Sequence, residues 1–304
     1  MEDTDRRRLG FIGLGNIGGA MAANLVTDGH ELTVCDVDQA RLAALVAVGA
    51  SGAESPAAVA AQADCTFLSL PSPSVMESVT RKWLEGVSGD TALLVDLTTN
   101  APATVQNMGK VVSRAGARLV EAPLTGGAVG ARNRQLVFIL GGDDTDVARA
   151  TPLLRTLGRA VFHLGPLGTG NIGKLVNSLM AFTTQWASLE GLALAAKHGV
   201  DLRTLVELIR TSGAATSYLE RRVEQIDERG RPAEFALELA AKDAGLMVEA
   251  GRDAGAPMPV ASALLEVLSF AVRQGLGGRD ISDLVEVAER AAATELRLGP
   301  PRQS

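Results

Sequence analysis

The sequence is poor in aromatic residues, cysteine and histidine. Aromatic residues make up 3% of its 304 positions, and it contains two cysteines and three histidines. Cys35 and Cys65 lie in apolar, strand-like runs without a CxxC pattern, which indicates reduced core residues rather than a disulfide or a metal pair. His30, His163 and His198 fall in separate segments, so we predict no metal site from the spacing of ligands.

Long apolar runs and an excess of positive charge are also missing. No uninterrupted apolar stretch reaches the roughly 20 residues that cross a bilayer, and the N-terminus shows no signal-peptide pattern. The net charge of -6 argues against a nucleic-acid partner. With 46% hydrophobic and 21% charged residues, the composition is typical of a globular protein large enough for two domains. We expect a cytoplasmic location, without membrane or nucleic-acid partners.

Lysine is scarce as well, because only five of the 29 basic residues are lysines. These five are Lys82, Lys110, Lys174, Lys197 and Lys242. A lysine can lose its proton in a buried site, whereas an arginine effectively cannot. Each lysine is therefore worth examining as a group that exchanges protons.

The order of apolar and amphipathic runs predicts two domains. Up to residue 165, short apolar runs alternate with longer amphipathic ones, which indicates a parallel sheet covered by helices on both faces. After "GPLGTG" the strand patterns nearly vanish and Ala/Leu-rich helical stretches follow. We predict a doubly wound Rossmann-type α/β domain over residues 1–165 and an all-helical domain, for substrate binding and oligomerisation, over residues 166–304.

The N-terminal "GFIGLGNIGGAMAANL" predicts a dinucleotide site. Gly13, Gly15 and Gly18 have GxGxxG spacing between a strand and a helix, and Asp36 lies at the end of the next strand. The predicted cofactor contacts in this loop also include Leu14, Asn16 and Ile17. A carboxylate at Asp36 would bind the ribose and repel the extra phosphate of NADP, so we predict NAD. The alternatives are a plain tight turn with Asp36 capping a helix, and NADP bound by Arg41.

Two further loops occupy the position expected for cofactor contacts, at the carboxyl ends of strands. They contain Leu70 and Pro71 in "LSLPSP", and Thr98 and Thr99 in "DLTTNAP". The alternative role is helix capping by Ser72 and Thr99. The residues alone do not choose between these roles.

The segment "GTGNIGKLVNSLM" predicts a helix with a polar stripe. Gly170, Lys174, Asn177 and Ser178 share one side, with Asn171 close by. Gly173 next to the lysine costs about 1 kcal/mol relative to alanine, which we interpret as room for a large group to approach the backbone. The alternative is an exposed lysine on a solvated strip.

The loop "EAPLTGGAVG" follows another strand. Its Thr125 hydroxyl and the N–H groups of Gly126 and Gly127 are suited to holding a carboxylate. The alternative is a glycine-rich turn between two strands.

Four segments together resemble the β-hydroxyacid dehydrogenase family, which includes 3-hydroxyisobutyrate dehydrogenase and tartronate semialdehyde reductase. These are the N-terminal glycine loop, "EAPLTGG", the lysine helix and "FALELAAKDAGLMVEAG". The resemblance implies that Lys174 is the catalytic acid/base and that Asn177 helps to orient the substrate carboxylate, with Ser178 beside it in the substrate site. It also implies that Thr125, Gly126 and Gly127 bind substrate and that Thr99 and Lys242 contact the cofactor. Thr125 and Ser178 depart from the usual serine and asparagine.

The function expected from this resemblance is reversible NAD-dependent oxidation of a small β-hydroxy acid to its semialdehyde or oxo acid. Burial and the positive charge of oxidised nicotinamide should lower the pKa of Lys174. The alternatives are an NADPH-dependent aldehyde or imine reductase, against which Lys174 argues, and a non-catalytic cofactor-binding scaffold. Decarboxylating 6-phosphogluconate dehydrogenases would need a phosphate site, for which only Arg132 and Arg134 are available in the loop. Apolar helices in the second half predict a homodimer or homotetramer.

Overall fold

The computed structural model describes residues 7–89 and 91–299, so the outermost residues of both predicted domains lie outside the described parts. The chain forms two compact units. Unit 1 ends at Lys174 and unit 2 begins at Leu175.

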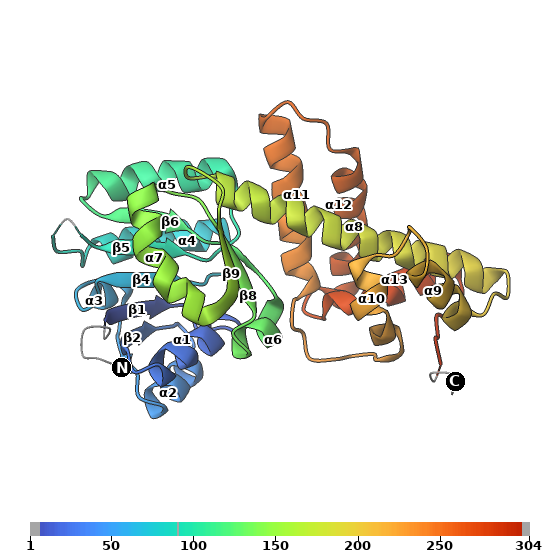
Figure 1. The fold of residues 1–304 in the computed structure, drawn as a ribbon, viewed down its shortest axis with the longest axis horizontal. Coiled ribbons are helices and arrows are strands. Elements are labelled where there is room, and N and C mark those ends of the chain that lie inside the picture. Colours follow the sequence, from blue (N-terminus) through green and yellow to red (C-terminus); the bar gives the residue numbers. More distant parts are fainter. Residues whose placement is uncertain (1–6, 90, 300–304) are drawn as a thin grey trace. The chain divides into compact units, whose positions relative to one another are not determined.

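Unit 1 alternates strands and helices over most of its length (Figure 1). Its first nine elements are β1 (Arg8–Ile12), α1 (Gly18–Thr27), β2 (Glu31–Cys35), α2 (Gln39–Ala47), β3 (Ser51–Gly52), α3 (Pro56–Ala60), β4 (Cys65–Leu68), α4 (Pro73–Leu84) and β5 (Leu93–Asp96). They are followed by α5 (Pro102–Arg114), β6 (Arg118–Glu121), β7 (Leu124–Thr125), α6 (Gly127–Arg132), β8 (Leu136–Leu140), α7 (Asp144–Leu157), β9 (Gly158–His163) and the first residues of α8 (Thr169–Lys197).

The main sheet has the strand order β3-β2-β1-β4-β5-β6, and each of its pairs is parallel. The strand order reverses direction between β1 and β4, which is the position where open α/β sheets bind ligands at their carboxyl edge. A second sheet, β7-β8-β9, has one antiparallel and one parallel pair. The predicted doubly wound Rossmann-type fold is confirmed.

Both faces of the main sheet are covered by apolar side chains from helices. On one face, Phe11 and Phe67 pack with residues of α1 and α7 such as Met21 and Leu154. On the other face, Leu68 and other strand residues pack with residues of α3, α4 and α5. Because helices cover both faces at the middle of the sheet, the central strands β4 and β5 are buried along their whole length.

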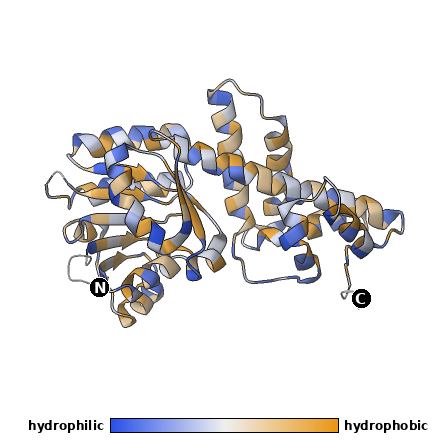
Figure 2. Cartoon of the chain, in the orientation of Figure 1, coloured by the Kyte–Doolittle hydropathy of each residue, from blue (hydrophilic) through white to orange (hydrophobic). Residues whose placement is uncertain are grey.

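Unit 2 is built from helices in the part that the structure describes. It contains the rest of α8, then α9 (Leu202–Arg210), α10 (Ser217–Arg221), α11 (Leu237–Asp253), α12 (Pro259–Ala271) and α13 (Leu284–Ala292), with short helical turns at Val223–Asp227, Val272–Leu276 and Ile281–Asp283. Within the described residues of this unit, strand-like pairing is limited to one antiparallel bridge between Ala236 and Asp280. Its helices carry both hydrophobic and hydrophilic residues (Figure 2), as amphipathic helices do. Among the described residues, the structure contains no helix with the length and hydropathy of a membrane span.

Candidate functional site

The glycine loop joins β1 to α1, and its three glycines have different surroundings. A Cβ added at Gly13 would lie 2.3 Å from the Ser69 carbonyl oxygen, and one at Gly18 would lie 2.1 Å from the Gly13 carbonyl oxygen. At Gly15 the nearest atom would be Arg41 Nη1, 3.7 Å away, so this side of the loop is open. The same turn contains Leu14, Asn16 and Ile17. Helix α1 begins without a side-chain cap, so its first N–H groups can bind a pyrophosphate.

Asp36 follows β2 and holds the glycine loop through its carboxylate. Oδ2 accepts a hydrogen bond of 2.5 Å from the Leu14 N–H, and Oδ1 accepts one of 2.7 Å from the Asp38 N–H. Helix α2 is capped by Asp38, which accepts from the N–H groups of Ala40 and Arg41. The alternative that Asp36 caps this helix is therefore wrong. Its carboxylate lies at the end of β2, where a ribose is expected.

The loops after β4 and β5 are joined to each other. The Leu70 N–H, next to Pro71, donates to Thr98 Oγ1 at 3.2 Å. Ser72 caps α4, as the alternative role predicted. Helix α5 instead has Ala101 as its N-cap residue, so Thr99 does not occupy the N-cap position of this helix.

The predicted substrate loop lies between β7 and α6 rather than directly between two strands. Thr125 pairs with Val137 in the second sheet. Gly126 and Gly127 have φ values of +125° and +65°, which side chains rarely adopt, and a Cβ at Gly127 would meet nothing within 4 Å. This leaves room beside the backbone, as a carboxylate site requires.

The Arg134 side chain forms hydrogen bonds within unit 1. Its guanidinium donates to both carboxylate oxygens of Asp28, at 2.7 and 2.8 Å, and to the carbonyl oxygens of Asn24 and Thr156. These contacts use the donors that a substrate phosphate would need.

Lys174 lies in the first turns of α8, which begin against β8. A Cβ at Gly170 would lie 2.7 Å from the Ile139 carbonyl oxygen, and one at Gly173 would lie 2.4 Å from Leu164 Cδ1. The side chains of Leu164 and Ile139 therefore come close to the backbone at Gly173, in line with our interpretation that a large group approaches there. The Lys174 residue is 8% exposed, and this burial does not fit the alternative of an exposed lysine on a solvated strip.

The other predicted site residues belong to unit 2. Asn177 and Ser178 lie three and four residues beyond Lys174 on α8; Asn177 is exposed and Ser178 is buried. Lys242 lies on α11, with Nζ 3.0 Å from Asp243 Oδ1. The Asp243 side chain is 2% exposed, so the two residues are not the exposed charge pair of the alternative interpretation.

Two buried carboxylates that the motifs did not reveal lie at the same edge of the sheet. Asp96 ends β5 and Glu121 ends β6, and the two are paired in register. Burial raises the pKa of Asp96 to about 7 and also raises the pKa of Glu121, although hydrogen bonds oppose both shifts. The signal in the sequence was a carboxylate at the end of an otherwise apolar strand, in "LLVD" and "RLVE".

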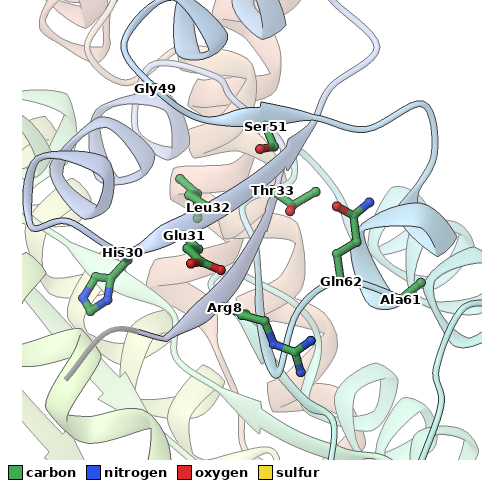
Figure 3. A pocket seen from close by; sticks show the side chains of 9 residues that line it. All are labelled: Arg8, His30, Glu31, Leu32, Thr33, Gly49, Ser51, Ala61 and Gln62. Carbon is green, nitrogen blue, oxygen red and sulfur yellow. The ribbon is translucent and has the colours of Figure 1, made fainter. Parts of the chain in front are cut away.

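A hollow lies at the opposite, amino edge of the sheet (Figure 3). It is lined by residues at the starts of β1, β2 and β3, including Arg8, Glu31 and Ser51. Arg8 is paired there with Asp64, at 2.6 Å. Ligands of open α/β sheets bind at the carboxyl edge, so the hollow is separate from the site described above.

Comparison with known proteins decides the family. Residues 8–165 match the family model described as the NAD binding domain of 6-phosphogluconate dehydrogenase. Residues 168–288 match the model described as NAD-binding of NADP-dependent 3-hydroxyisobutyrate dehydrogenase. The chain belongs to the β-hydroxyacid dehydrogenase family. Its resemblance to this family, predicted from four segments of sequence, is confirmed.

Relatives within the β-hydroxyacid dehydrogenase family match almost the whole chain. The chain is 31% identical to 2-(hydroxymethyl)glutarate dehydrogenase of Eubacterium barkeri, over 96% of this chain and 98% of the relative. It is also 31% identical to NAD-dependent L-serine dehydrogenase of Pseudomonas aeruginosa, over 91% and 96%. The structure of Mycobacterium tuberculosis 3-hydroxyisobutyrate dehydrogenase with L-serine has a TM-score of 0.85 and 25% identity, covering 93% of this chain and 99% of that one. These findings support pyridine-nucleotide binding and an oxidoreductase acting on hydroxyl groups.

Proposed function

We propose that this protein catalyses the reversible NAD-dependent oxidation of a small β-hydroxy acid to its semialdehyde or oxo acid. The observation that carries the proposal is the burial of Lys174 in the first turns of α8, in the same unit as a dinucleotide loop that fits a pyrophosphate. A buried amine at this place suits a group that exchanges protons with substrate.

Lys174 is the proposed acid/base. When bound, the nicotinamide would supply the hydride acceptor for oxidation and the hydride donor for reduction. In oxidation the neutral amine of Lys174 takes the proton of the substrate hydroxyl. In reduction the ammonium stabilises the developing alkoxide and then returns the proton to it.

The substrate carboxylate would be held by two groups of residues. The first is the loop of Thr125, Gly126 and Gly127, whose open backbone is described above. The second is Asn177 and Ser178, which follow Lys174 on α8 at helical spacing. The substrates named for the relatives, 3-hydroxyisobutyrate, L-serine and 2-(hydroxymethyl)glutarate, share a hydroxymethyl group on the carbon next to a carboxylate. We propose the same arrangement for the substrate of this protein.

NAD is the proposed cofactor because of the carboxylate at Asp36. It lies at the end of β2, bonded to the Leu14 N–H of the glycine loop, where a 2′-phosphate would meet its negative charge. Arg41 is near Gly15, but its Nε is 3.3 Å from Asp38 Oδ2, and this ion pair opposes its use for a phosphate. We propose that Leu70, Pro71, Thr99 and Lys242 contribute the remaining cofactor contacts.

We also propose that the helical part over residues 166–304 selects substrate and mediates self-association into a homodimer or homotetramer. Large apolar side chains are exposed on its helices, among them Met180, Leu194, Val260 and Phe270. Such side chains are typical of surfaces that are covered in an oligomer. Light scattering of the purified protein distinguishes a monomer from these assemblies.

The test is a substrate screen with NAD and NADP in parallel. Formation of reduced cofactor is followed with 3-hydroxyisobutyrate, 3-hydroxypropionate, L-serine, glycerate and 2-(hydroxymethyl)glutarate. We expect turnover with at least one of these acids and a higher kcat/KM with NAD than with NADP. Higher kcat/KM with NADP would overturn the cofactor assignment. Turnover of imines alone would favour the imine-reductase alternative, and nucleotide binding without any turnover would favour a scaffold.

A further inference from the structure

The carboxylate of Glu121 binds the N–H groups at the start of helix α8. Its Oε1 accepts hydrogen bonds from the N–H groups of Gly168, at 2.5 Å, and Gly170, at 2.9 Å. Its Oε2 accepts from the Asn171 N–H at 3.2 Å and also from Asn171 Nδ2. The first turn of the helix is therefore bound to the end of β6 by a carboxylate that lies about fifty positions earlier in the chain. Helix α8 begins at Thr169, and the glycine before it has no side chain, so the Glu121 carboxylate takes the place of an N-cap side chain.

Asn171 connects this helix start to the loop after β5. It is fully buried, and its Oδ1 accepts a hydrogen bond of 2.7 Å from the Asn100 N–H. Asn100 in turn donates from Nδ2 to Asp96 Oδ2, at 2.7 Å, and the Asp96 Oδ1 accepts from the Thr98 N–H. These bonds form one chain from β5 through Asn171 to Glu121.

The same chain reaches a predicted cofactor loop. Thr98 accepts the hydrogen bond from the Leu70 N–H, and its neighbour Thr99 is a proposed cofactor contact. At its other end, Lys174 follows Asn171 by three residues, so the two residues lie one above the other on the helix surface. The network therefore joins the loops proposed to contact the cofactor to the helix turn that carries the proposed acid/base.

Keeping this network is costly for the fold. Burial raises the pKa of Glu121 despite the bonds it accepts, so its ionised form is destabilised in place. Close packing already holds the same turn, because Gly170 lies against the backbone at the end of β8 and Gly173 lies against the Leu164 side chain. A requirement for precise placement explains why charged and amide groups are added to a turn that is already packed.

We propose that Asn171 and Glu121 are positioning residues that fix the amine of Lys174 relative to the Thr98–Asn100 loop. The proposal rests on the proposed function of Lys174. Neither residue needs to contact substrate or cofactor, so both act through the placement of the lysine. An error of about 1 Å in such placement can lower a rate by about a hundredfold.

The first test compares Asn171→Ala with a matched control, Thr66→Val. Thr66 is also fully buried in unit 1, and it accepts a hydrogen bond of 3.0 Å from Trp83 Nε1, away from α8. Asn171→Ala loses two buried side-chain hydrogen bonds and Thr66→Val loses one, so both should lower the melting temperature. Asn171→Ala should lower kcat by about 10- to 100-fold with KM values within about threefold of the wild type, whereas Thr66→Val should leave kcat unchanged. A normal kcat for folded Asn171→Ala would overturn the proposal.

The second test asks whether Asn171 acts through the lysine. Asn171→Ala is combined with Lys174→Ala, and the single-turnover rate of hydride transfer is measured for each member of the cycle. We expect Asn171→Ala to slow hydride transfer at least about tenfold when Lys174 is present and less than about twofold when it is absent. Equal effects in both backgrounds would mean that Asn171 acts independently and would overturn the proposal.

Two outcomes have separate meanings. If Lys174→Ala alone kept normal turnover, the proposed function would fail, whatever Asn171 does. If Lys174→Ala abolished turnover while Asn171 variants were fully active, only the positioning proposal would fail. Asn171→Ser removes less volume and cannot span both Glu121 and Asn100, so it replaces Asn171→Ala in both tests should that variant not fold.

Discussion

Asp96 should make unit 1 less stable as the pH rises from about 5 to about 8. Burial raises the pKa of this carboxyl from 3.8 to about 7 in the folded protein. Between these two values the folded state holds a proton that the unfolded state has lost, so the free energy of unfolding falls with rising pH. The stabilising contribution is complete below about pH 4 and lost above about pH 8.

The magnitude follows from the size of the shift. At about 1.4 kcal/mol per unit, a shift of about three units is worth about 4 kcal/mol in total, of which about 2 to 3 kcal/mol is lost between pH 5 and 8. Because the pKa of Glu121 is also raised, this residue likewise lowers the free energy of unfolding as the pH rises. The pKa of Asp280 is lowered, so its contribution changes only below about pH 4, outside this window.

The assay uses Asp96→Asn, because an amide does not titrate. The Oδ1 of the neighbouring Asn100 has no hydrogen-bond partner, so rotation of that side chain can satisfy the new amide. Unfolding of unit 1 in urea is followed by fluorescence of Trp83, with Trp186→Phe in every protein because the chain has two tryptophans. The exposed Asp253→Asn serves as a control and should keep the pH dependence of the parent. The same pH dependence in Asp96→Asn as in the parent would refute the reasoning.

Further predictions concern the glycine loop, the cofactor and an ion pair. Gly18→Ala should lower stability by about 1–3 kcal/mol and abolish nucleotide binding, whereas Gly15→Ala should keep the melting temperature and weaken binding alone. A lower melting temperature of Gly15→Ala in calorimetry would contradict the finding that a Cβ has room at this position. Asp36→Asn should lower kcat/KM for NAD by about tenfold and raise that for NADP, and an unchanged ratio in steady-state assays would contradict the cofactor assignment. Arg134→Met should lower the free energy of unfolding by about 1–3 kcal/mol, because Asp28 loses its partner, and should leave kcat unchanged. Unchanged stability in urea unfolding, or a clear fall in kcat of the folded variant, would contradict this structural role.

The fold and the glycine loop could be predicted because their signals are local. Apolar runs of strand length alternating with helices indicate a parallel sheet wherever they occur. The spacing of Gly13, Gly15 and Gly18 reflects contacts within a short turn, as the close approach of Gly18 to the Gly13 carbonyl oxygen shows. Asp36 was expected at the end of its strand and lies there.

The network around Glu121 could not be predicted, because its partners are distant in sequence. Glu121 binds residues 47 to 50 positions later, and Asn171 binds Asn100, 71 positions earlier. A periodic pattern cannot show which strand end a helix start will meet. The side chain that approaches Gly173 could not be identified for the same reason, because Leu164 comes from the connection between β9 and α8.

The central claim is that the amine of Lys174 exchanges the proton of the substrate hydroxyl. The most direct test compares Lys174→Ala with the wild type in two measurements, NADH binding by fluorescence titration and turnover of the best substrate. We expect the Kd for NADH to stay within about twofold and kcat to fall at least about a hundredfold, as loss of a general acid/base requires. Near-normal kcat in a folded, NADH-binding variant would contradict the account.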